Sequence, residues 1–139
     1  MDDPYDLQRF VDAQNPVFEQ ACAELRAGQK HGHWMWFIFP QLRGLGHSQM
    51  AIKFAISSRD EAVAYLKHQV LGARLRECTQ LVMLVEGRSI NQIFGSPDDL
   101  KFRSSMTLFA STTSTNQTFK DALQKYFAGE LDRLTVERL

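Results

Sequence analysis

Helix start and stop signals divide this chain of 139 residues into short segments, and they constrain its fold more than any other feature. Asp3-Pro4 and Asn15-Pro16 each place a capping side chain before a proline, which suits the first turn of a helix. Gly28 and Gly87 follow apolar runs, where glycine commonly ends a helix. Ser96-Pro97-Asp98-Asp99 adds two acids, which the helix dipole favours in a first turn. The signals predict short helices with short connections.

Apolar residues between these signals recur at helical rather than strand spacing. The longest stripe joins Leu71, Leu75, Cys78 and Val82. Only the segment from Trp34 to Phe39 competes as a strand, because aromatic residues have strand propensity. We therefore predict an all-α fold, a compact multihelical single domain over residues 1–139 with about seven helices in orthogonal packing.

Composition and charge restrict the class of protein further. Hydrophobic residues make up 44% of the chain, enough to fill one core. Because 16 basic and 16 acidic residues balance, the net charge argues against nucleic acid as a partner. No apolar run approaches the roughly 20 residues of a membrane span, so we expect no membrane partner. Cys22 and Cys78 lie in apolar helical patterns typical of free, buried thiols, and we expect a cytoplasmic protein.

Aromatic and polar side chains are mixed in the segment KHGHWMWFIFPQLRGLG, from Lys30 to Gly46. Most of its rings are expected in the core, because aromatic side chains bury large areas. The polar residues between the rings and the glycine-rich entry to the next helix instead suggest a binding site, where backbone N–H groups could receive an anion. The residues predicted here to bind a ligand are Lys30, Trp34, Trp36, Phe37, Gln41, Gly46 and Ser48.

A second polar cluster lies in the segment DDLKFRSSMTLF, and two interpretations of it remain open. It is either a solvated helix face with an Asp98–Lys101 pair, or a polar face that lines a cleft. Two adjacent serines are mildly unfavourable inside a helix, which suggests close packing or a specific hydrogen bond. In the second interpretation Lys101, Arg103, Ser104 and Ser105 bind the ligand.

Motifs for metal and cofactor binding are absent from the sequence. His31 and His33 would need at least one more ligand to hold a metal, and neither an HExxH nor a CxxC motif is present. The chain also has no GxSxG, GxxxxGK[ST] or GxGxxG motif. We therefore predict no metal and no cofactor. If the site is catalytic, His33 and Asp99 are the candidates for general acid or base.

Three stretches carry a family resemblance: KHGHWMWFIFPQLRGLGHSQMA, EAVAYLKHQVLGARLRECTQLV and IFGSPDDLKFRSSMTLF. They resemble the bacterial domain of unknown function 1810 family, whose members are often labelled calpastatin, and the similarity runs from about Phe10 to Leu134. The resemblance implies a multihelical single domain and no established activity. The calpastatin label does not fit, because calpain inhibitors of that kind are disordered whereas this composition is that of a packed domain.

A weaker similarity links AIKFAISSRDEAVAYL and the helix with Asp98, Lys101 and Met106 to the NADAR-type proteins, which act on N-glycosidic ribose derivatives. Their Glu-His pair before a glutamine is absent here, so this likeness implies a class of ligand only. The first hypothesis is that the protein binds a small nucleotide- or sugar-phosphate-like ligand in an aromatic and basic cleft, with hydrolysis left open. The alternative is a non-enzymatic interaction or self-association module, such as a homodimer, that uses the aromatic segment.

Overall fold

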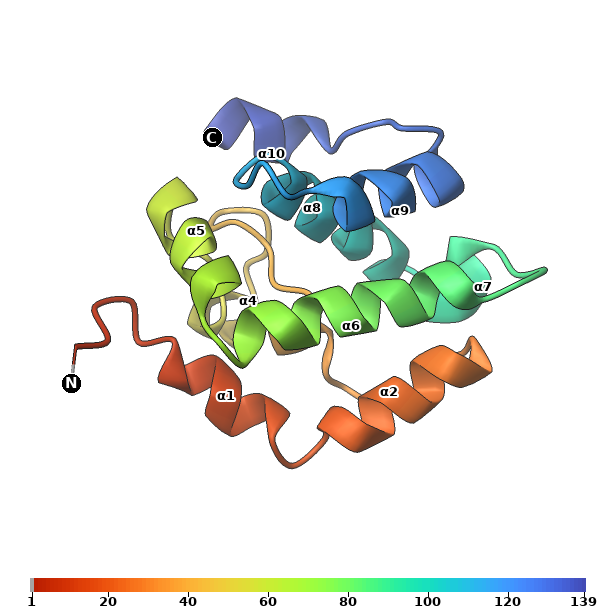
Figure 1. Cartoon of the computed structure of the whole chain (residues 1–139), viewed down its shortest axis with the longest axis horizontal. Helices are drawn as coiled ribbons and strands as arrows, with labels where there is room; N and C mark the ends of the chain where they lie inside the picture. The colour runs from red at the N-terminus through yellow and green to blue at the C-terminus, as the bar shows by residue number, and fades with distance from the viewer. Residues whose placement is uncertain (1) are drawn as a thin grey trace.

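The structure, a computed structural model, describes residues 2–139, and they form ten helices that run in several directions rather than as one parallel bundle (Figure 1). The helices are α1 (Gln8–Gln14), α2 (Phe18–Ala27), α3 (Met35–Ile38), α4 (Gln49–Lys53), α5 (Arg59–Lys67), α6 (Leu71–Leu84), α7 (Ile90–Phe94), α8 (Asp98–Ala110), α9 (Gln117–Phe127) and α10 (Arg133–Arg138). Within the described residues, strand-like pairing is limited to one isolated parallel bridge between Leu42 and Ile56. The all-α prediction is confirmed. The structure has more helices than the predicted number, because single-turn helices such as α3 are too short to show a helical spacing of apolar residues.

Local capping chemistry sets several helix ends. The hydroxyl oxygens of Ser48 and Ser58 each accept a backbone N–H bond at the starts of α4 and α5. Asp3 also caps, but its carboxylate accepts from backbone N–H groups four and five residues later, so α1 begins later than predicted. At the start of α8 the capping position is occupied by Pro97 rather than by Ser96, and no side chain caps that end.

The aromatic rings form much of one connected hydrophobic core. Phe39 meets Phe102 edge to face with ring centroids 5.0 Å apart, and Phe102 also stacks on Phe94 at 5.0 Å. Helix α8 lies centrally, since it contacts α5, α7, α9 and α10. Both Cys22 and Cys78 are free and buried, as predicted.

A partly buried ion pair joins α1 to the first turn of α5. The Arg9 Nη2 atom lies 3.0 Å from Glu61 Oε2, and the Arg9 guanidinium also donates to the carbonyl oxygens of Lys53 and Ala55. The other oxygen of Glu61 accepts from the backbone and the hydroxyl of Ser57. Because both partners are fully hydrogen-bonded, the pair fixes the position of Ala55, which lines the cleft described below.

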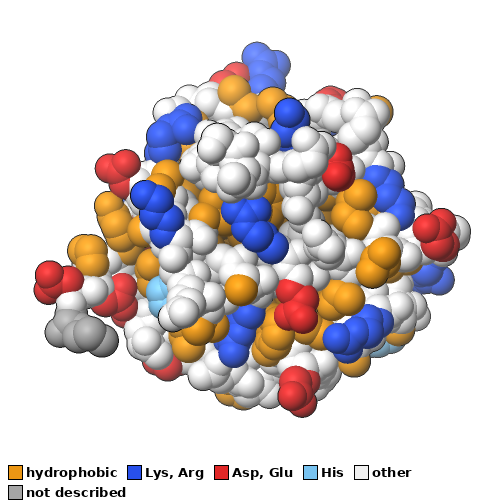
Figure 2. All heavy atoms as spheres, in the orientation of Figure 1, with side chains coloured by type: hydrophobic (Ala, Val, Ile, Leu, Met, Phe, Trp, Pro, Cys, Tyr) orange, Lys and Arg blue, Asp and Glu red, His pale blue; other side chains and the backbone are white. Residues whose placement is uncertain are grey.

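Charged and apolar side chains are mixed on the surface. On the face in Figure 2, basic, acidic and hydrophobic side chains alternate without forming one large basic field. The longest helix, α6, has 14 residues. None of the helices in residues 2–139 has the length and apolar character that a bilayer span requires.

Gly72 provides a test of the contact between α5 and α6. An added Cβ there would lie 2.1 Å from the Leu66 carbonyl oxygen, which belongs to the backbone of α5. We expect Gly72→Ala to lower the free energy of unfolding by about 1–3 kcal/mol in urea denaturation, although alanine favours helix. The control Ala73→Gly, at the exposed neighbouring position, should cost no more than about 1 kcal/mol. A Gly72→Ala variant as stable as the wild type would contradict this close approach.

Candidate functional site

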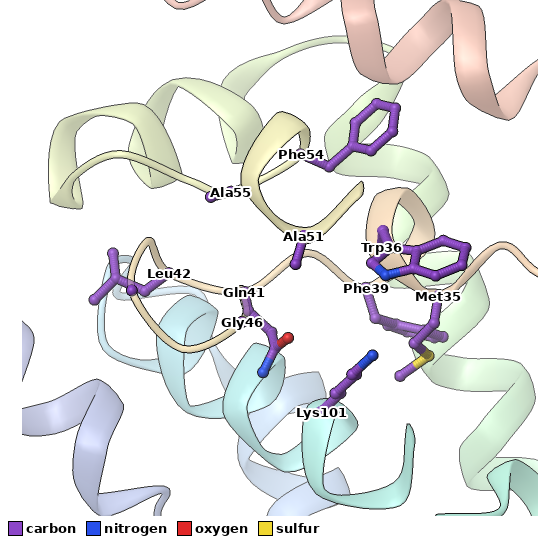
Figure 3. Close-up of a pocket in the computed structure, with 11 residues that line it drawn as sticks. Met35, Trp36, Phe39, Gln41, Leu42, Gly46, Ala51, Phe54, Ala55 and Lys101 are labelled. Carbon is purple, nitrogen blue, oxygen red and sulfur yellow. The ribbon is translucent and has the colours of Figure 1, made fainter. Parts of the chain in front are cut away.

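A narrow cleft, here called the Trp36 cleft, lies between α3, the loop of residues 42–48, α4 and the first turn of α8 (Figure 3). Its polar lining comes from Trp36, Gln41 and Lys101, and its loop side includes Gly44 and Gly46. The empty space including the mouth is about 330 Å³, but only about 10 Å³ is open to the centre of a water molecule. The cleft therefore has room for about one water molecule as it stands.

The ammonium group of Lys101 provides the charge that lines the Trp36 cleft. Its Nζ lies 5.7 Å from the centroid of the Trp36 ring and 3.6 Å from Asp98 Oδ1. The other oxygen of Asp98 lies 2.9 Å from Lys30 Nζ, so two ammonium groups share one carboxylate. This cluster keeps one net positive charge. Figure 3 shows the Lys101 side chain extending from α8 toward α3, with the Trp36 ring on one side of it and the Gln41 amide on the other.

The Glu24 carboxylate positions the segment that leads into the Trp36 cleft. Glu24 Oε1 accepts from the backbone N–H groups of His31 and Gly32 at 2.8 and 2.9 Å and from Trp34 Nε1 at 3.0 Å. Partial burial alone would raise the pKa of Glu24, but these bonds and one from a neighbouring glutamine outweigh it and lower the pKa to about 2. Trp34 is consequently buried in the core, whereas Trp36 stays half-buried at the cleft.

Four of the residues predicted to bind a ligand line the Trp36 cleft together: Trp36, Gln41, Gly46 and Lys101. Three come from α3 and the loop that follows it, and Lys101 comes from α8, which is far away in the sequence. The structure thus brings the aromatic segment and the DDLKFRSSMTLF segment to one hollow, but only through a subset of the predicted residues.

The other predicted residues of the aromatic segment lie elsewhere. Trp34 and Phe37 are core residues, only 1% and 6% exposed. Phe37 packs on Phe54 with ring centroids 5.2 Å apart. Lys30 is turned to Asp98 and to the carbonyl oxygen of Gly32. Ser48 is exposed and caps α4.

Of the polar face predicted on α8, only Lys101 lines the Trp36 cleft. The Arg103 guanidinium lies 3.8 Å from Asp132 Oδ1 and 5.8 Å from the centroid of the Phe127 ring. Ser104 donates to the backbone carbonyl one turn earlier. Ser105 is fully buried, and its hydroxyl has no hydrogen-bond partner among residues 2–139.

The two candidate acid–base residues do not line the Trp36 cleft. His33 is exposed. Asp99 accepts from Asn91 Nδ2 at 3.1 Å and from the Leu100 backbone N–H at 2.9 Å. Their catalytic role stays a prediction. Over the described part of the chain, no three His, Cys, Asp or Glu side chains are grouped as a metal site would require.

Arg138 and Glu24 support the Trp36 cleft without lining it, and the sequence pattern revealed neither. An added Cβ on Gly44, whose φ is +96°, would lie 2.7 Å from Arg138 Nη1, so the guanidinium of α10 lies against the loop of the Trp36 cleft. Both residues contact segments that are distant in the sequence, and the spacing of residues within one helix does not indicate such contacts. Glycine at position 44 was the only local signal, because a positive φ and a close approach both favour glycine.

Residues 4–139 match the family described as Protein of unknown function (DUF1810), which confirms the resemblance found in the sequence. The chain is also similar to the crystal structure of the conserved hypothetical protein Rv1873 from Mycobacterium tuberculosis, with 61% sequence identity and a TM-score of 0.98. That similarity covers 99% of this chain and 98% of the other. Among curated proteins, none matches the chain.

Replacing Glu24 tests its role in positioning the segment. We expect Glu24→Gln to lower the free energy of unfolding at pH 7 by about 1–3 kcal/mol, because a neutral amide oxygen accepts hydrogen bonds more weakly. Since the pKa of Glu24 is lowered from 4.5 to about 2, its contribution is complete above pH 4.5 and is lost as the pH falls toward 2. Urea denaturation should therefore show the two proteins converging over that interval.

The control for this experiment is Glu77→Gln, an exposed carboxylate on α6, which should change the free energy of unfolding by no more than about 0.5 kcal/mol. If Glu24→Gln is as stable as this control at pH 7, the carboxylate does not hold the segment in place.

Proposed function

We propose that this chain, which belongs to the DUF1810 family, binds a small nucleotide- or sugar-phosphate-like ligand in the Trp36 cleft. The observation that carries the proposal is the convergence of three chemically different groups on one hollow. They are the half-buried indole of Trp36, the amide of Gln41 and the ammonium of Lys101. Aromatic rings stack on bases and sugars, and an ammonium group binds phosphate, so this combination suits a ligand with both parts.

Each of the three groups has a distinct role in the proposal. The Trp36 ring supplies a flat apolar surface, and its half-buried position leaves one part of the ring free. Lys101 supplies the charge, because its contact with Asp98 at 3.6 Å is long and Asp98 is closer to Lys30. The Gln41 amide both donates and accepts, which selects among polar groups of similar size.

Entry of the ligand requires movement of the loop that carries Gly44 and Gly46, since the Trp36 cleft now admits about one water molecule. Small residues bring this loop close to α4: an added Cβ on Gly46 would lie 2.7 Å from the Cβ of Ala51. In the proposal a phosphate oxygen takes the water-sized space beside Lys101. The loop moves outward to admit the rest of the ligand.

Two broader readings of the sequence have less support. Self-association through the aromatic segment would need exposed rings, but Trp34, Phe37 and Phe39 are buried and only Trp36 is partly accessible. Hydrolysis would need an acid or base beside the ligand, and the candidates His33 and Asp99 lie outside the lining. The proposal is therefore binding, with no reaction assigned.

Isothermal titration calorimetry with AMP tests the proposed function. We expect saturable binding to the wild type and an affinity at least about 10-fold lower for Lys101→Gln, because a charge-assisted hydrogen bond is lost. The matched control is Lys120→Gln, which removes an exposed lysine of α9 and should bind AMP like the wild type.

Adenosine has the base and sugar of AMP but no phosphate, so it measures the contribution of stacking without that of charge in the same assay. We expect it to bind more weakly than AMP to the wild type and equally to the wild type and Lys101→Gln. Absence of heat with AMP, with adenosine and with glucose 6-phosphate, while circular dichroism shows a folded protein, would overturn the proposed function. If Lys101→Gln and Lys120→Gln lower the AMP affinity equally, the ligand does not bind in the Trp36 cleft.

A further inference from the structure

A second and much roomier hollow adjoins the Trp36 cleft. We call it the Arg43 hollow; its lining includes Tyr5, Arg9, Arg43, Lys53 and Ala55. About 350 Å³ of it is open to the centre of a water molecule, against about 10 Å³ in the Trp36 cleft. The larger value reaches the size range of small-molecule sites, and the Arg43 hollow is shallow and open to solvent. The space that the Trp36 cleft lacks for a whole ligand is thus available next to it.

The two hollows meet along the short bridge between Leu42 and Ile56. The Arg43 backbone N–H donates to the Ile56 carbonyl oxygen at 2.8 Å, and the Ile56 N–H donates to the Gln41 carbonyl oxygen at 2.9 Å. Gln41 lines the Trp36 cleft, Arg43 lines the second hollow, and Ala55 lines both. One ligand that lies across Ala55 would therefore reach both spaces.

The charge of the Arg43 hollow favours an anion. Arg9 and Glu61 neutralise each other, and the Arg9 guanidinium is also occupied by backbone carbonyl oxygens. Arg43 and Lys53 are exposed, and within residues 2–139 neither side chain forms an ion pair or a hydrogen bond. Asp6 is the acid left in the lining, so two cations face one carboxylate. Lys53 Nζ lies 5.3 Å from the centroid of the Phe54 ring, so an incoming anion would displace no carboxylate or hydrogen-bond partner from either cation.

We propose that the ligand carries two anionic groups, one bound by Lys101 in the Trp36 cleft and the second by Arg43 and Lys53 in the Arg43 hollow. This inference rests on the proposed function and names its substrate class: a nucleotide with two phosphate groups. The half-buried ring of Tyr5 gives the second part of the ligand an apolar surface. In this proposal only one group of the ligand enters the narrow Trp36 cleft. The rest of the ligand lies in the Arg43 hollow.

Titration calorimetry with AMP, ADP and adenosine 3′,5′-bisphosphate tests this inference. We expect ADP or the bisphosphate to bind the wild type at least about 10-fold more tightly than AMP, because a second phosphate gains charge-assisted contacts. In the double variant Arg43→Gln/Lys53→Gln, the ratio of that affinity to the AMP affinity should fall to about 1. Because both affinities in the ratio are measured on the same protein, a general effect of the variant on binding cancels.

The control is Lys120→Gln/Arg133→Gln, which removes two exposed cations elsewhere and should keep the wild-type ratio. Circular dichroism and thermal unfolding check that each variant is folded. If both two-phosphate probes bind no better than AMP, or if the test and control variants change the ratio equally, the inference is overturned while AMP binding at Lys101 stands. If none of the probes binds, both proposals fail.

Discussion

The hydrogen bonds of the Glu24 carboxylate determine how the aromatic segment enters the core. One oxygen accepts from two successive backbone N–H groups and from the indole of Trp34, which closes the chain back onto α2 before α3 begins. Trp34 is then directed inward and Trp36, two residues later, lies at the cleft. Ionisation of Glu24 strengthens each of these bonds, which accounts for its low pKa. A single carboxylate thus decides which of two neighbouring indoles packs and which stays accessible.

Helix α8 is the second element on which the Trp36 cleft depends. Its middle is buried among α5, α7, α9 and α10, so its first turn is held against the aromatic segment. Asp98 in that turn binds Lys30 closely and Lys101 loosely, which leaves Lys101 partly free beside Trp36. The core therefore places a charge beside the Trp36 ring, and the loop with Gly44 and Gly46 forms another part of the lining. In the proposed function this loop moves to admit the ligand.

The sequence predicted the helical class and the end of α2 at Gly28, because a glycine after an apolar run is local chemistry that residue order records. It predicted part of the candidate site, since Trp36, Gln41, Gly46 and Lys101 do line one hollow. It did not separate Trp36 from Trp34 or Phe37, because a single turn of helix is too short for a period to show which ring faces inward. The roles of Glu24 and Arg138 depend on contacts between distant segments, which no local pattern contains.

The most direct test of the account is the pair of indole N–H signals in a ¹H–¹⁵N NMR titration with AMP. The chain has two tryptophans, so each signal can be assigned by replacing one of them with phenylalanine. We expect the chemical shift of the Trp36 indole N–H to change in a saturable manner. The shift of the Trp34 indole N–H, which donates to Glu24, should stay constant. A Trp36 signal that stays fixed at saturating AMP, or a Trp34 signal that moves as far, would contradict the assignment of the cleft.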